Sequence, residues 1–225
     1  MFDNIKADLA VVLEKDPAAR SKFEVFFTYG GFSELCAYRM AHWFYIHKMP
    51  FIAQIISFRA RKHYGIEIHP AAKIGKGIMI DHGNGLVIGE TTEIGDNVII
   101  YQGVTLGGTG KDVGKRHPTI GNNVMICAGS KILGPVTIGD HTKIGAGSVV
   151  LKDVPPHCTV VGVPGRIVKM HGEKYNDMDQ KLPDPVLEEF ARINKRLEQI
   201  ESNLNIHACR YSISQQLETD ETGEQ

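Results

Sequence analysis

A histidine beside an aspartate in the segment MIDHGNG, residues 79–85, is the first candidate for chemistry. His82 could act as a general base near neutral pH, because a free imidazole has a pKa of about 6.5. Such a base is worth roughly 10²–10⁴ in rate when it takes the proton of an attacking hydroxyl. It works best when a carboxylate holds its second nitrogen, and Asp81 and Glu67 are the nearby acids. The alternative is that His82 only fills a turn.

An arginine–histidine pair, Arg116 and His117, ends the glycine-rich segment GGTGKDVGKRHP at residues 107–118. The guanidinium of Arg116 offers a planar fork that fits a carboxylate with two hydrogen bonds. Because Lys111 and Lys115 are close by, the alternative is a solvated basic loop tip. The GGTG run lacks the GxxxxGK[ST] pattern of a nucleotide-binding loop. Its glycines instead allow the backbone to approach a ligand closely.

Both segments interrupt a repeat of six residues. Two extra residues enter the repeat after Ile80, and eight enter after Leu106. A helix needs apolar residues three and four apart, so a period of six predicts a solenoid of very short strands, each followed by a turn. A glycine-rich β-sandwich is the alternative, but nothing in a sandwich maintains one period for so long. The repeating positions are Ile74, Ile80, Ile88, Ile94, Ile100, Leu106, Ile120, Ile126, Ile132, Ile138, Ile144 and Val150.

The regions that flank the repeat have a different composition. Residues 1–62 contain few glycines and carry apolar residues at helical spacing, which predicts an N-terminal α-helical segment. Asp16 before Pro17 suits a helix boundary, because Asp is a good N-cap and Pro is favoured in a first turn. Residues 63–168 form the predicted β-helix domain. Residues 169–225 are predicted to be a C-terminal extension with a helix at 185–205 and a disordered polar tail, so the fold class is α+β.

The C-terminal helix has an apolar stripe with alternating spacings of four and three residues, which is a heptad pattern. A helix this short is marginal alone in water, so the stripe needs a partner. One interpretation is packing on the chain's own β-helix or N-terminal helices, and the other is a short coiled coil of three copies. The stripe consists of Val186, Phe190, Ile193, Leu197, Ile200 and Leu204.

The bulk composition excludes several classes of protein. The 225 residues carry 25 basic and 26 acidic side chains, a formal net charge of −1 that gives no attraction to nucleic acid or an anionic membrane. No apolar run approaches the roughly 20 residues that span a bilayer. The four cysteines show no CxxC pairing, which favours a reducing cytoplasm. No ligand-like spacing of histidine and cysteine predicts a metal site.

Together, the elements DHGNG (81–85), GGTGK (107–111) and RHP (116–118), with KDPAAR at 15–20 and GVPGRIV at 162–168, resemble serine O-acetyltransferase, a hexapeptide-repeat acetyltransferase family. The resemblance covers roughly residues 10–170. It implies a left-handed parallel β-helix and homotrimers with the active site between neighbouring subunits. It also implies acetyl transfer from acetyl-CoA to the hydroxyl of L-serine, which gives O-acetyl-L-serine for cysteine biosynthesis.

The resemblance assigns roles to individual residues. His82 matches the catalytic base of a direct attack without an acetyl-enzyme, and Glu67 matches the acid that orients it, which is often aspartate. Four positions match the groups that hold the substrate: Asp16 and Asp81 for its ammonium, Arg116 and His117 for its carboxylate. The coenzyme A groove matches the coils carrying Gly108, Ala128, Lys143 and Ala146.

Two further expectations concern partners and acceptors. Family members that dock into O-acetylserine sulfhydrylase end in isoleucine, whereas this chain ends in Gly223, Glu224 and Gln225, which argues against that partner. The alternative function is a hexapeptide acetyltransferase that acts on a sugar or another small hydroxyl compound. Such an enzyme would share the base, but it would not need Asp16 and Asp81 facing Arg116.

Overall fold

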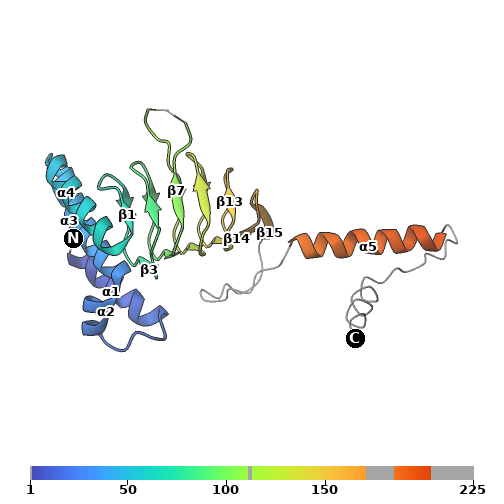
Figure 1. Ribbon diagram of the computed structural model, residues 1–225, viewed down its shortest axis with the longest axis horizontal. Coiled ribbons are helices and arrows are strands. Elements are labelled where there is room, and N and C mark those ends of the chain that lie inside the picture. The colour runs from blue at the N-terminus through green and yellow to red at the C-terminus, as the bar shows by residue number, and fades with distance from the viewer. Residues whose placement is uncertain (1, 111–112, 171–184, 204–225) are drawn as a thin grey trace, which may run out of the picture. The chain divides into compact units, whose positions relative to one another are not determined.

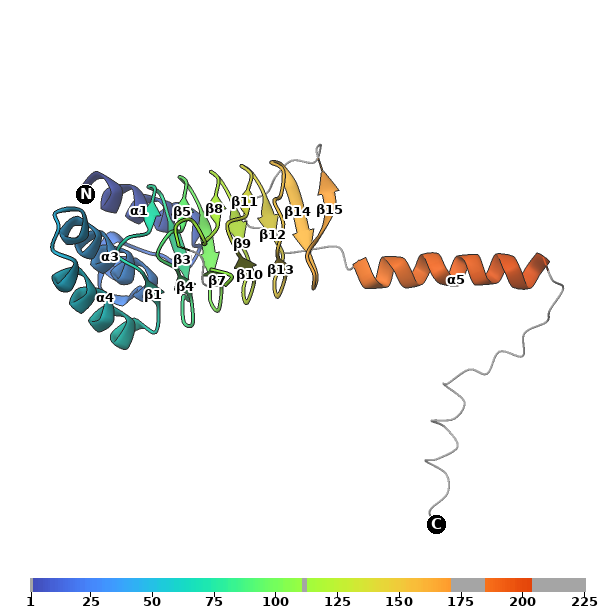
Figure 2. The same ribbon diagram turned by 90° about the horizontal axis from the view of Figure 1, so that it is seen from above.

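The computed structural model describes residues 2–110, 113–170 and 185–203. Four N-terminal helices precede a coil of short parallel strands, and the last described element is the helix α5 (Pro185–Asn203) (Figure 1 and Figure 2). The chain divides into two compact units, Met1–Pro183 and Asp184–Gln225. This confirms the predicted order of helical segment, parallel β-helix and C-terminal helix. The tail that was predicted to be disordered lies outside the described residues.

Local signals set the bounds of the N-terminal helices. The Ser21 hydroxyl caps the second helix by accepting a hydrogen bond from the Glu24 N–H at 3.2 Å. Pro50 lies in the first turn of the fourth helix, and Gly65 ends it with a left-handed φ of 68°. None of the described helices is long and apolar enough to span a bilayer. The helices are α1 (Phe2–Lys15), α2 (Lys22–Thr28), α3 (Gly30–Ile46) and α4 (Pro50–Tyr64).

The helix boundary expected at Asp16 is present, because α1 ends at Lys15, but the N-cap of the next helix is Ser21 rather than Asp16. The Asp16 N–H donates to the Val12 carbonyl at 2.9 Å and completes α1, while its Oδ1 accepts from the Ala18 N–H at 2.8 Å. An aspartate side chain that binds the backbone two residues on stabilises a turn. Asp16 therefore begins the turn that leads from α1 to α2.

The coil has three faces, each a sheet of short strands. The first sheet has the order β1 (Glu67–Ile68), β4 (Val87–Ile88), β7 (Thr105–Gly107), β10 (Lys131–Leu133) and β13 (Val149–Val150). The second sheet has the order β11 (Thr137–Ile138), β8 (Thr119–Ile120), β5 (Glu93–Ile94) and β2 (Lys73–Ile74). The third sheet has the order β15 (Arg166–Met170), β14 (Cys158–Val161), β12 (Lys143–Ile144), β9 (Met125–Ile126), β6 (Ile99–Tyr101) and β3 (Met79–Asp81). All pairings are parallel except that of β14 with β15.

Contacts between successive coils show where the inserted residues go. A plain coil takes 18 residues, as the bond from the Asn122 N–H to Asp140 shows. The coil with the first insertion takes 20 residues, the separation of Lys73 from Glu93. The coil with the second takes 26 residues, the separation of Asp96 from Asn122. Three faces of six residues account for 18, so the extra residues bulge out at corners and leave the strand register intact.

Each short strand turns one aliphatic side chain into the coil, which is why the sequence repeats every six residues. Partners in the first sheet form one continuous buried column, since parallel pairing places equivalent residues above one another. Burial of this column supplies the hydrophobic stabilisation of the coil. The column consists of Ile68, Ile88, Leu106, Ile132 and Val150.

A buried ion pair and a close contact join the helices to the coil. Arg39 on α3 donates to both carboxylate oxygens of Asp8 on α1, at 2.8 and 3.1 Å, and Asp8 also accepts from the Ile78 N–H. At Gly31 on α3, an added Cβ would lie 2.1 Å from the Ile80 carbonyl oxygen. Only glycine allows this approach. These contacts set where the end of α1, and with it Asp16, lies against the coil.

Candidate active site

The predicted base lies in the corner that joins β3 to β4, residues 82–86. The Gly85 N–H donates to the Gly65 carbonyl at 2.8 Å, and the Gly103 N–H donates to the Asn84 carbonyl at 2.9 Å. These bonds stack the corner on the coils before and after it. We call this column of corners between the third and first sheets, residues 82–86, 102–104, 127–130 and 145–148, the His82 edge.

His82 is held loosely. Its side chain is 74% exposed, and its Nε2 lies 3.7 Å from Oδ1 of Asp81. Burial raises the pKa of Asp81, an effect that the nearby imidazole of His82 opposes and the charge of Asp16 reinforces. A partly buried carboxylate with a second acid close by gains from any added cation. The two carboxylates can therefore bind an ammonium group beside the imidazole.

Tyr29, at the junction of α2 and α3, completes this acidic cluster. Burial, a hydrogen bond with Asp16 and the charges of Asp16, Glu24 and Asp81 raise the pKa of Tyr29 to about 12. Its hydroxyl therefore stays protonated and serves as a donor to Asp16. No sequence pattern pointed to Tyr29, because this residue reaches Asp16 and Asp81 only once the helices pack on the coil.

Glu67 is the first residue of β1, on the coil adjacent to the corner that carries His82. Its carboxylate pairs with Arg61 rather than with His82. Glu67 lies 3.1 Å from the Arg61 guanidinium at the end of α4, and both side chains are partly exposed. Among the contacts of the described residues, the carboxylate paired with His82 is Asp81 rather than Glu67. An exposed ion pair of this kind is worth little energy, so Glu67 can exchange partners.

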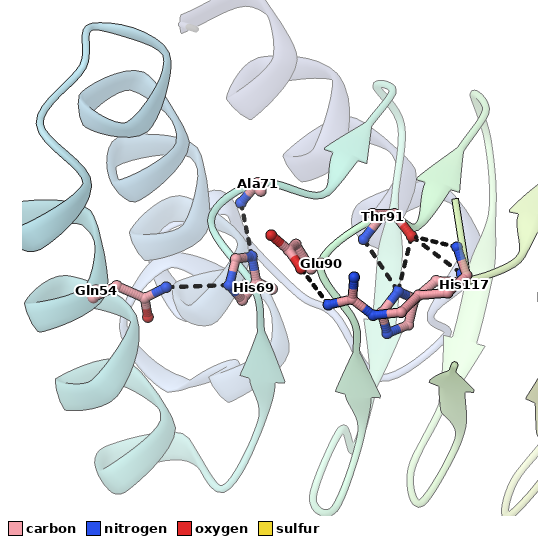
Figure 3. A network of polar contacts seen from close by, with 7 residues as sticks. Gln54, His69, Ala71, Glu90, Thr91 and His117 are labelled. Carbon is pink, nitrogen blue, oxygen red and sulfur yellow. Dashed lines mark hydrogen bonds and ion pairs between the residues drawn. The ribbon is translucent and has the colours of Figure 1, made fainter. Parts of the chain in front are cut away.

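The second cluster occupies the corners between the first and second sheets. We call this column of corners the Arg116 edge, and its described residues are 69–72, 89–92, 108–110 and 113–118. Thr91 is its centre (Figure 3). The Thr91 hydroxyl oxygen accepts from the backbone N–H groups of Arg116 and His117, both at 3.1 Å. The Thr91 N–H lies 3.2 Å and its hydroxyl 2.9 Å from Nδ1 of His117. Because the backbone N–H can only donate, Nδ1 is an acceptor and the ring proton sits on Nε2.

Burial and a neighbouring charge favour the neutral form of His117. The residue is 9% exposed, and burial lowers the pKa of its imidazole, as does the adjacent guanidinium of Arg116. A neutral ring with its proton on Nε2 donates a hydrogen bond without carrying charge. Gly89 and Gly108 make room for this ring: an added Cβ would lie 2.0 Å from the ring at Gly89 and 3.4 Å from Nε2 at Gly108.

Arg116 is also positioned before any ligand arrives. Its guanidinium contacts the carboxylate of Glu90, and both side chains are about one-third exposed. His69, on the coil before, accepts from the Ala71 N–H at 3.1 Å and lies 3.1 Å from the Gln54 amide (Figure 3). Burial lowers the pKa of His69, which the charge of Glu90 opposes. The Arg116 edge therefore presents a cationic fork and a neutral N–H donor.

The two clusters occupy different edges of the same sheet. His82 precedes β4 and Glu90 follows it, so the first sheet separates the base from the carboxylate-binding groups. The predicted groove positions are divided in the same way. Ala128 and Ala146 stack on the His82 edge, where the Gly147 N–H donates to the Ala128 carbonyl at 2.9 Å. The other two positions lie elsewhere: Gly108 under Arg116, and Lys143 largely buried on the third sheet.

Known proteins share this architecture. A family profile described as "Bacterial transferase hexapeptide (six repeats)" matches residues 117–152. Serine acetyltransferase of Bacillus pumilus is 54% identical over 205 residues, 90% of this chain and 94% of that protein. The chain belongs to the serine acetyltransferase family.

Solved structures of the family carry the two expected ligands. Neisseria gonorrhoeae serine acetyltransferase in complex with serine superposes with a TM-score of 0.73 at 44% identity, covering 75% of this chain and 69% of that one. Brucella abortus serine acetyltransferase in complex with coenzyme A superposes with a TM-score of 0.74 at 44% identity, covering 76% and 68%. Serine acetyltransferases are acetyl-CoA-dependent acyltransferases, so the predicted enzyme class and co-substrate are confirmed.

Two residues that position Arg116 and His117 in this serine acetyltransferase were not predicted from the sequence. Thr91 and Glu90 were missed, although Thr91 lies 26 residues before His117 and Glu90 lies 26 residues before Arg116, the length of one coil with the second insertion. Counting back one coil from Arg116 and His117 would have found both. In residues 2–110, 113–170 and 185–203, no three His, Cys, Asp or Glu side chains are grouped to hold a metal ion.

Proposed function

We propose that this chain transfers an acetyl group from acetyl-CoA to the hydroxyl of L-serine, giving O-acetyl-L-serine and coenzyme A. The observation that carries the proposal is a pair of complementary clusters. Asp16 and Asp81 provide negative charge beside His82, and Arg116 with neutral His117 provides a cationic fork and an N–H donor. A free α-amino acid needs both kinds of partner at once, whereas a sugar needs neither.

In the proposed reaction His82 takes the proton of the serine hydroxyl as that oxygen bonds to the thioester carbonyl carbon. The carbon–sulfur bond then breaks, and His82 returns the proton to the sulfur of coenzyme A. Direct transfer is supported by the state of the cysteines, because Cys127 and Cys158 are buried and burial raises the pKa of both thiols. The described cysteines are all free thiols, which fits a reducing cytoplasm.

The orienting acid and the groove are part of the same proposal. Glu67 is assigned to orient His82, since Glu67 and the corner that carries the base lie on adjacent coils. This role requires Glu67 to leave Arg61. For coenzyme A we assign Gly108, Ala128, Lys143 and Ala146, of which Ala128 and Ala146 share the His82 edge.

We further propose that the site forms between copies of the chain in a homotrimer. A head-to-tail ring brings two different surfaces of neighbouring copies together at every interface. The His82 edge of one copy would then face the Arg116 edge of the next. This arrangement accounts for the separation of base and carboxylate-binding groups by the first sheet in one chain.

Mixing two inactive variants tests the shared site. His82→Ala lacks the base and Arg116→Ala lacks the fork, so each pure protein should be nearly inactive with low serine. After the two are unfolded and refolded together in equal amounts, about one site in four combines an intact base with an intact fork in a ring. We expect activity to recover toward that fraction, measured as thiol release from acetyl-CoA. No recovery in a mixed trimer would place both groups in one chain.

A panel of acceptors tests the substrate. We expect efficient acetylation of L-serine and poor acetylation of 3-hydroxypropionate, which lacks the ammonium, and of sugars. The alternative function, acetylation of a sugar or another small hydroxyl compound, predicts the reverse order. Equal rates with serine and 3-hydroxypropionate would show that Asp16 and Asp81 do not bind the ammonium group of the substrate.

A further inference from the structure

The helix α5 carries an apolar stripe that is exposed among the described residues. Phe190, Ile193, Leu197 and Ile200 are exposed by 59%, 44%, 49% and 51%. On the other faces of the described helix, Glu189 pairs with Arg192 at 2.7 Å, three residues along. Most of the stability of a helix in a protein comes from packing its apolar face, so the stripe needs a cover.

The residue types on the stripe indicate how many helices meet. Spacings of three, four and three residues place Phe190 and Leu197 at heptad position a, and Ile193 and Ile200 at position d. Leucine at a with isoleucine at d favours bundles of three or four helices over two. The stripe is therefore suited to meeting copies of itself in a closed bundle rather than one flat surface.

The charged residues that flank the stripe favour a bundle of parallel helices. In a parallel bundle, a residue at g faces the residue at e in the next heptad of its neighbour. Arg196 occupies g and residue 201, a glutamate, occupies the following e, so opposite charges would meet. A ring of identical copies also requires all equivalent helices to point the same way.

We propose that α5 helices from three copies of the chain form a parallel coiled coil that holds the trimer together. The connection does not prevent this, because residues 171–184 can reach about 50 Å when fully extended. Helices joined to an assembled β-helix trimer meet at a high effective concentration, so a short stripe suffices. The coiled coil gives the trimer an attachment in addition to the contacts between the β-helices.

Cross-linking on the full chain tests the contact. Ile193→Cys and Ile200→Cys place single thiols on the stripe, and Lys195→Cys places one on the opposite face as the matched control. All three are made with Cys209→Ser, and that parent gives the background from the other three cysteines, of which Cys127 and Cys158 are buried and Cys36 is partly exposed. We expect a trivalent maleimide to yield covalent trimers from both stripe variants and background levels from Lys195→Cys.

Every other pattern contradicts the proposal. Covalent dimers without trimers would mean that two helices meet. Cross-linking at only one of the two stripe positions would indicate antiparallel helices, which bring a residue beside its own copy at one level only. Background levels at both positions would mean that the stripe packs on its own subunit or on another partner.

A dilution series measures what the contact contributes. Leu197→Glu places a charge on the stripe, and Lys195→Glu adds the same residue outside it. We expect Leu197→Glu to dissociate, in sedimentation, at concentrations at least about tenfold higher than Lys195→Glu and the unchanged chain. Serine acetylation at concentrations where the trimer persists should be equal in all three. Identical dissociation of the three proteins would overturn the proposed attachment.

Discussion

The two polar clusters on either side of the first sheet are built in opposite ways. On the His82 edge the imidazole is 74% exposed, and its partner among the described residues is Asp81, 3.7 Å away. On the Arg116 edge His117 is 9% exposed and makes three hydrogen bonds with Thr91: Nδ1 bonds to the Thr91 N–H and hydroxyl, and the His117 N–H donates to the Thr91 hydroxyl oxygen. One histidine is free to move and exchange a proton, while the other is fixed in one tautomer.

This difference matches a division of labour between a base and a clamp. A clamp that is ordered before the ligand arrives loses little entropy on binding. A base must reach the hydroxyl and then the sulfur, so its imidazole needs room to move. In the proposed trimer, the exposed His82 edge is the part that a neighbouring copy would complete.

Removal of the base should have the largest effect. His82→Ala should lower kcat by at least about 10², because a positioned base contributes that much to proton transfer. Coenzyme A binding, measured by calorimetry, should be nearly unchanged. His63→Ala, which removes an exposed histidine near the end of α4, is the matched control and should keep normal turnover. Near-normal kcat in His82→Ala, or an acetylated protein trapped during turnover, would refute the assignment.

Changes to the clamp should act on serine affinity with a smaller effect. Arg116→Ala should raise the KM for serine by about 10- to 100-fold and alter kcat little, because charged hydrogen bonds of 1.5–3 kcal/mol are lost in ground and transition states alike.

Variants of Glu90 test whether this residue holds the Arg116 side chain in place or competes with the serine carboxylate for it. If Glu90 holds Arg116 in place, Glu90→Ala should raise the KM for serine, while Glu90→Gln, which keeps an acceptor oxygen, should stay close to the unchanged enzyme. If Glu90 instead competes with the serine carboxylate, both variants should lower the KM. Steady-state kinetics with varied serine separate the two outcomes.

The pH dependence of stability should show the smallest effect. The folded state lowers the pKa of His117, so the unfolded chain binds the proton more readily. The stability from neutral His117 is present above its unfolded pKa, about 6.5, and is lost as pH falls below it. Urea unfolding at pH 7.5 and 5.5 should show a smaller pH effect in His117→Gln than in the unchanged chain. His69 has a shift of the same sign, so some dependence should persist in the variant. An equal pH effect in both proteins would contradict this role of His117.

The sequence predicted the architecture because the repeat has a direct physical cause. A period of six puts one aliphatic residue on each face of a three-sided coil, and the core column from Ile68 to Val150 follows from it. The two breaks in the period predicted where polar groups would leave the coil. Asp16 was misjudged because its side chain can cap a helix or begin a turn equally well, and only the packing of α1 decides.

The sequence by itself determined the period, the inserted corners and the residue types that serine chemistry needs. Tertiary structure alone decided which side chains pair: Glu67 with Arg61, Tyr29 with Asp16, and Thr91 with His117. The physical reason is that periodicity fixes which residues face the core. Which side chains pair at a corner depends on how the coils and helices stack. Thr91 and His117, for example, lie 26 positions apart in the sequence.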